Sequence, residues 1–182
     1  MLGRINITMK NILKINLTVL FIFVISSTYC QNTSLSIFKP FANIQWVGHY
    51  VNSSDSTLNH YIKWEFSLDS SYVIQTKEVP ELSFKMETYF YWDYELNQIS
   101  TLSLLNRDMI SKGRIELNNK KLEIYCRTFY PGGNRDSKQT WQINENGEVK
   151  DYFYKHESNE WIQGHLIIYE RTETLPIINK HH

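Results

Sequence analysis

Histidine, cysteine and acidic residues supply the side chains of this 182-residue chain that could bind a metal or act on a substrate. No pair of histidines shows the spacing and carboxylate context of a zinc motif such as His-Glu-x-x-His. We therefore expect no metal site and no cofactor. The six histidines are His49, His60, His156, His165, His181 and His182.

Cys126 is the candidate nucleophile of the central region. It stands beside Arg127, where a cation can lower the pKa of a thiol, but no histidine or acid accompanies it in a nucleophile motif. We interpret it as a small hydrophobic residue and expect no catalytic residues. Several acids alternate with apolar residues along the chain, which predicts that they face solvent: Glu65, Glu87, Asp93 and Glu123.

Strands must position these side chains, because nine runs rich in β-branched and aromatic residues follow residue 44 and no long stretch has a helical period. Short turns rich in Asn, Asp, Ser and Gly separate them, so consecutive strands are expected to be antiparallel neighbours. The runs cover residues 44–51, 60–68, 72–78, 83–94, 99–105, 110–117, 122–130, 139–143 with 149–155, and 161–172.

Alternation within the runs predicts one buried and one wet face. Ile62, Trp64 and Phe66 fall on one side of their strand, and Tyr61 and Lys63 on the other. A flat sheet of this many strands would expose two edges, whereas a closed barrel has none. We therefore predict an all-β fold, an antiparallel up-and-down meander barrel of about eight to ten strands.

Large aromatic residues occupy many of the predicted inward positions. A barrel of eight or more strands has room for one small ligand, so these residues either line a cavity or fill the barrel as an ordinary core. Both alternatives remain open from the sequence. The candidate ligand-binding residues are Trp46, Trp64, Phe66, Phe84, Phe90, Trp92, Trp141 and His165.

The segment Gln45-Trp46-Val47-Gly48-His49-Tyr50 resembles the opening strand of lipocalin-like (calycin) barrels, with the order Trp-x-Gly in place of Gly-x-Trp. The carboxy-terminal half is similar to bacterial exported lipocalin-like families of unknown function. The resemblance covers residues 44–172, implies a lipocalin-like barrel and brings no catalytic residues to transfer. In the carboxy-terminal half, the resemblance rests on Trp141-Gln142-Ile143, Asn146-Gly147-Glu148-Val149, His156-Glu157-Ser158-Asn159-Glu160-Trp161 and Tyr169-Glu170-Arg171.

His165 lies in the last predicted strand, where a histidine resembles the haem ligand of nitrobindin-like barrels. An inward ring could meet an iron, whereas an outward ring would face solvent or a neighbouring strand. The alternation around His165 does not decide its face.

The amino terminus has the pattern of a secretory signal peptide over residues 1–30, with cleavage expected before Gln31 and a start at Met1 or Met9. Lipidation of Cys30 is the alternative. A polar lead-in (31–43), the barrel domain (44–173) and a tail (174–182) follow. The expected location is secreted or periplasmic, and no membrane span is expected once the signal is removed.

Charge and composition exclude a nucleic-acid partner, because 19 basic residues balance 19 acidic ones. The favoured function is binding of a small, largely apolar ligand inside the barrel without transforming it. An enzyme is less favoured. The alternative is an interaction module, with no identified partner, that uses an outer patch of Tyr61, Tyr89, Tyr91 and Tyr125.

Overall fold

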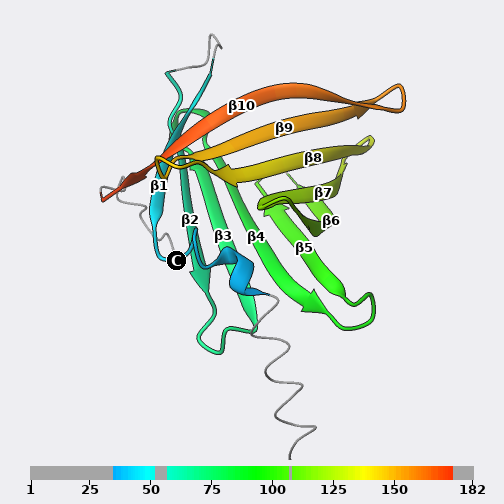
Figure 1. Cartoon of the computed structure of the whole chain (residues 1–182). Helices are drawn as coiled ribbons and strands as arrows, with labels where there is room; N and C mark the ends of the chain where they lie inside the picture. The colour runs from blue at the N-terminus through cyan, green and yellow to red at the C-terminus, as the bar shows by residue number, and fades with distance from the viewer. Residues whose placement is uncertain (1–34, 52–56, 107, 174–182) are drawn as a thin grey trace, which may run out of the picture.

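The computed structural model describes residues 35–51, 57–106 and 108–173, and within them ten antiparallel strands close into a barrel (Figure 1). Two short 3₁₀ helices complete the elements of these ranges. The elements are η1 (Leu35–Phe38), β1 (Gln45–Tyr50), β2 (His60–Phe66), β3 (Tyr72–Val79), η2 (Pro80–Leu82), β4 (Phe84–Asp93), β5 (Gln98–Leu105), β6 (Met109–Asn118), β7 (Lys121–Tyr130), β8 (Gly133–Ile143), β9 (Val149–Glu157) and β10 (Glu160–Thr172).

Each strand pairs with the next along the chain, and β1 pairs with β10 to close the ring. The closing register runs from Gln45 opposite Thr172 to Tyr50 opposite Ile167. Closure leaves no strand of the ring with an unpaired edge. The prediction of an all-β, up-and-down meander barrel is therefore confirmed, at the upper end of the expected strand number.

Strand β8 is longer than the sequence pattern predicts. The residues expected to form a loop before position 139 instead extend the strand back to Gly133, which pairs with Tyr130. Gly132 adopts a φ of 103°, a left-handed conformation that suits glycine in a tight turn. The inward residues Arg135 and Ser137 are polar, so this half of β8 lacks the apolar alternation that marks a half-buried strand.

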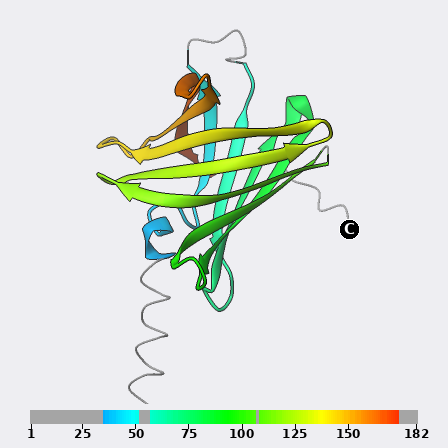
Figure 2. The same ribbon diagram turned by 90° about the vertical axis from the view of Figure 1, so that its right-hand side faces the viewer.

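One end of the barrel is filled by a cluster of aromatic rings. The Trp64 ring stacks on Phe38 and Phe90, with centroids 5.4 and 4.9 Å apart, and meets Trp141 edge-on at 5.4 Å. Figure 2 shows η1, which carries Phe38, at this end of the barrel. Buried aromatic pairs of this geometry stabilise a core beyond their area alone.

The lead-in expected over residues 31–43 contributes to this core. Leu35, Phe38 and Phe41 are buried, and the Trp46 indole Nε1 donates a hydrogen bond of 3.2 Å to the Phe41 carbonyl oxygen. The packed unit therefore includes residues from Leu35 onward, ahead of the domain start expected at residue 44. Residues 1–34 and 174–182, with the expected signal and tail, lie outside the described ranges.

Gly48 lies where β1 pairs with β10 to close the barrel, and its lack of a side chain leaves room for a ring. It pairs with Tyr169 on β10, and a Cβ built on Gly48 would lie only 2.6 Å from Cε1 of the Tyr169 ring. That distance is far inside van der Waals contact, so any larger residue would displace the fully buried tyrosine. The Trp-x-Gly segment thus places Trp46 in the core and Gly48 against the Tyr169 ring.

Replacing Phe38 with alanine should lower the free energy of unfolding by about 3–5 kcal/mol, because it removes a fully buried ring from the aromatic cluster. Urea unfolding followed by tryptophan fluorescence measures the loss. Phe129→Ala is the matched control, since this ring lies exposed on β7 and its removal should cost little. Equal losses in the two variants would contradict the packing of η1 into the barrel.

Candidate functional site

The other part of the barrel interior contains a cavity of about 370 Å³. Its wall is formed by η2, β1 to β10 and the inward side chains they present. Pockets of this size suit small organic molecules. The lining comprises Tyr50, His60, Gln75, Lys77, Val79, Leu82, Phe84, Met86, Thr88, Phe90, Ser103, Leu105, Met109, Ser111, Ile124, Cys126, Thr128, Arg135, Ser137, Gln139, Phe153, Lys155 and His165.

The period of two along each strand selects which residues face the cavity. On β3 the inward positions beyond the core residue Val73 are Gln75, Lys77 and Val79, all buried. Because side chains alternate between the faces of a strand, these positions share one side. The interior changes along the strands from large apolar side chains to polar and smaller ones, and this change leaves the cavity space.

Hydroxyl groups line the wall formed by β4 to β8. The Thr88 hydroxyl donates to Ser103 Oγ at 2.9 Å, and the Thr128 hydroxyl donates to Ser111 Oγ at 3.2 Å. In each pair the two hydroxyl groups come from adjacent strands and bond to each other, which stabilises a buried polar wall.

Cys126 lies in the same wall, half-buried, with its Sγ 3.7 Å from the Thr101 hydroxyl. Burial raises the pKa of its thiol above the ordinary value of 9.0. The protonated thiol therefore predominates at neutral pH, which agrees with its interpretation as a small hydrophobic side chain.

Two histidines flank Tyr50 in the cavity. The Tyr50 ring meets His60 edge-on at 4.5 Å and His165 edge-on at 5.0 Å, and the Phe153 ring stacks on His165 at 4.8 Å. Burial, followed by the charge of Lys77, lowers the pKa of His60 to about 3 and that of His165 to about 4. Both rings are therefore neutral at physiological pH.

A β-bulge in β10 decides the face of His165, which the sequence left open. The register of β10 against β9 shifts between Gln163 and His165, so Gly164 is an extra residue. His165 therefore points inward, although Trp161, four residues earlier, packs outside against Tyr125. Such a shift turns every following side chain to the opposite face.

Lys77 and Asp151 form an ion pair beside the cavity, with Nζ and Oδ2 4.0 Å apart. Asp151 is fully buried and Lys77 is 8% exposed. Burial raises the pKa of Asp151 to about 6, opposed by the lysine, and burial lowers the pKa of Lys77, opposed by the aspartate. Neither Asp151 oxygen has a hydrogen-bond partner among the described residues.

The structure divides the aromatic residues predicted to bind a ligand. Phe84, Phe90 and His165 line the cavity. Phe66 and Trp92 are partly buried against the aromatic cluster. Trp46, Trp64 and Trp141 are fully buried in that cluster and lie outside the cavity lining.

Sequence reasoning named His165 but missed the other polar residues at the cavity, although the pattern contained a signal. Lys77 falls between Gln75 and Val79 on the inward side of its strand, and Asp151 falls between Val149 and Phe153 on the inward side of β9. A charged residue in phase with buried apolar neighbours points to a functional interior, because burial of a charge is costly without a partner.

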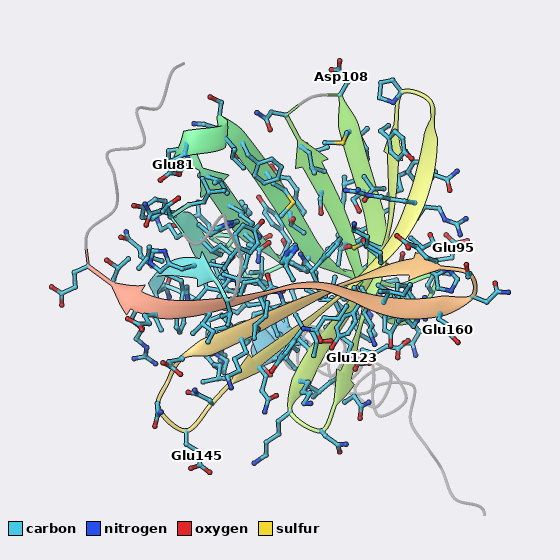
Figure 3. The ribbon with its side chains drawn as sticks, turned by 90° about the horizontal axis from the view of Figure 1, so that it is seen from above. Glu81, Glu95, Asp108, Glu123, Glu145 and Glu160 are labelled. Carbon is cyan, nitrogen blue, oxygen red and sulfur yellow. The ribbon has the colours of Figure 1, made fainter. Side chains whose placement is uncertain are left out.

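Most carboxylates lie away from the interior. Viewed from above, Glu81, Glu95, Asp108, Glu145 and Glu160 lie at the edge of the molecule, in or next to the connections between strands (Figure 3). Over the ranges that the structure describes, no three His, Cys, Asp or Glu side chains gather in a group suited to a metal ion. The cavity therefore offers hydrogen bonds and positive charge.

Three of the four expected outer tyrosines belong to two separate groups. The ring centroids of Tyr89 and Tyr72 lie 6.1 Å apart, and Tyr91 lies opposite Tyr72 in the pairing of β3 with β4. Tyr125 lies on β7, with β5 and β6 between it and β4. Tyr61, on β2, is half-buried. The expected patch is thus not continuous.

The second group forms a basic and aromatic surface over β6 to β10. Arg114 covers the Tyr125 ring at 4.8 Å, Lys138 covers the Tyr154 ring at 4.7 Å, and Trp161 meets Tyr125 edge-on. An open hollow of about 560 Å³ lies beside it. Cation–π contacts of this kind hold such half-buried rings in place.

No family model and no curated protein matches the sequence. The closed ten-strand meander is compatible with the lipocalin-like architecture that the sequence resembles. Across the described residues, no helix is both long and apolar enough to span a bilayer.

Replacing His60 with glutamine should make the free energy of unfolding fall less steeply as the pH is lowered. The pKa of His60 is about 3 in the folded protein against 6.5 for the free side chain, so the unfolded chain takes up the proton first. Stability contributed by this group is full above pH 6.5 and is lost as the pH falls towards 3. One proton contributes at most about 1.4 kcal/mol per pH unit.

Urea unfolding at a series of pH values measures this slope. His156→Gln is the control, since it makes the same substitution at an exposed position of β9 and leaves the buried His60 in place. Identical slopes for the wild type and His60→Gln would contradict a neutral, buried His60.

Proposed function

We propose that this chain binds a small molecule in the barrel interior and does not transform it. The observation that supports the proposal best is the cavity of about 370 Å³ inside a closed barrel. Its wall combines apolar side chains such as Phe84, Met86 and Leu105 with a few polar groups. Sites that bind small ligands share this composition, since apolar walls supply affinity and polar groups fix orientation.

The division of the interior supports binding inside the barrel. The aromatic cluster fills one part of the interior and stabilises the barrel there, so the remaining volume is free for a ligand. The ligand expected from the sequence was largely apolar. The cavity favours a molecule that also carries a polar group.

Interaction through the outer wall is the second candidate function. The hollow beside Tyr125 and Trp161, with Arg127 and His156 in its lining, is the observation that favours it. Exposed aromatic and basic side chains of this kind are typical of surfaces that contact other molecules.

A tryptophan placed in the cavity should weaken the binding of a neutral apolar dye. Met86→Trp on β4 fills the cavity, whereas Lys85→Trp adds the same ring to the outer face of the same strand. We expect N-phenyl-1-naphthylamine to bind the wild type and Lys85→Trp with one-to-one stoichiometry, and Met86→Trp at least about tenfold more weakly. Fluorescence titration measures both.

Two outcomes would count against internal binding. Equal dye affinity of Met86→Trp and Lys85→Trp would place the dye elsewhere. Failure of the dye to bind the wild type would favour the second candidate function, interaction through the outer surface around Tyr125 and Trp161.

Export to the periplasm or the medium is part of the proposal and rests on the N-terminal pattern. In a bacterium that expresses the complete chain, we expect an exported protein whose mass matches Gln31 to His182. Intact-mass measurement tests this processing. A lipid-modified chain that begins at Cys30, or an uncleaved chain in the cytoplasm, would contradict it.

A further inference from the structure

The fixed charges of the cavity lining are all of one sign. The lining includes Lys77, Arg135 and Lys155 and, within the described part of the chain, no aspartate or glutamate. Arg135 and Lys155 are exposed, and neither forms an ion pair with another described residue. A concave wall with surplus positive charge concentrates anions.

Lys77 supplies the buried charge of this wall. Its Nζ lies 4.0 Å from the Asp151 carboxylate, which is beyond hydrogen-bonding distance, so the pair is held by charge alone. An ammonium group carries three N–H donors. Asp151 offsets the cost of burying the cation, while the Lys77 donors remain open to a ligand in the cavity.

His60 adds a second unsatisfied group beside Lys77. It is 3% exposed, lines the cavity, and neither ring nitrogen has a hydrogen-bond partner among the residues described. A neutral imidazole has one N–H donor, and leaving it unpaired in the interior costs free energy. A ligand that accepts from His60 removes this cost.

An apolar row leads away from Lys77 across the sheet. In the strand register Lys77 lies opposite Met86, Met86 lies opposite Leu105, and Leu105 lies opposite Met109. All four line the cavity. Three strand spacings cover roughly 14 Å, so the row joins one charged end to an apolar track of that length.

We propose that the ligand is a medium-length amphipathic carboxylate. Its carboxylate lies beside Lys77 and accepts a hydrogen bond from His60, and its chain lies along Met86, Leu105 and Met109. Arg135 and Lys155 attract the anion from solution. This inference rests on the proposed function, because it assigns the chemistry of the same cavity.

Octanoate and 1-octanol form the matched test pair, since they share a chain length and differ in the charged group. Displacement of N-phenyl-1-naphthylamine near pH 7.5 should show octanoate binding the wild type at least about tenfold more tightly than 1-octanol. Lys77→Met should abolish this preference and leave 1-octanol within about threefold of the wild type. Lys85→Met, on the outer face of β4, should keep the preference.

Asp151→Asn tests the same site in the opposite direction and remains informative if Lys77→Met fails to fold. It removes the anion that competes for Lys77, so octanoate should bind about threefold or more tightly than to the wild type, with 1-octanol unchanged. Equal affinities of the wild type for octanoate and 1-octanol, or weaker octanoate binding by Asp151→Asn, would overturn the carboxylate proposal. Failure of the dye itself to bind the wild type would overturn internal binding.

Discussion

The Trp64 indole packs against four rings that come from three other parts of the chain. Phe38 and Phe41 reach it from the segment around η1, Phe90 from β4 and Trp141 from β8. These contacts cross the interior and hold opposite walls of the barrel at a fixed separation. The described part of the chain has one cysteine, so the aromatic cluster, in place of a disulfide, links distant segments of the chain there.

The concentration of large side chains in one part of the interior allows the rest to be polar. Where Trp64, Trp141 and Tyr169 fill the barrel, stability comes from apolar burial and ring contacts. Elsewhere the chain can accommodate Lys77 and Asp151, whose burial is costly and which contribute little net stability as an ion pair. The core thus offsets the cost of a polar site within the same fold.

The strands were predictable where the interior is apolar and less so where it faces the cavity. The alternation of Ile62 and Trp64 with polar neighbours marked β2, whereas Arg135 and Ser137 concealed the first half of β8. The sequence reasoning named large aromatic residues as candidates for the ligand wall and left open that they fill the barrel as a core. Much of the cavity instead lies beside small side chains such as Ser111, because a void forms where side-chain volume is missing.

Closure of the barrel joins the first strand to the last, with Trp46 opposite Arg171 and Gly48 opposite Tyr169. Contacts between residues so distant in sequence form late and slow the folding of all-β proteins, because a long loop must be closed first. Synthesis runs from the amino terminus, so β1 waits for its second partner until β10 has emerged. Until then both edges of the unfinished sheet stay open to aggregation, which makes the final thirteen-residue strand the one that commits the chain to its fold.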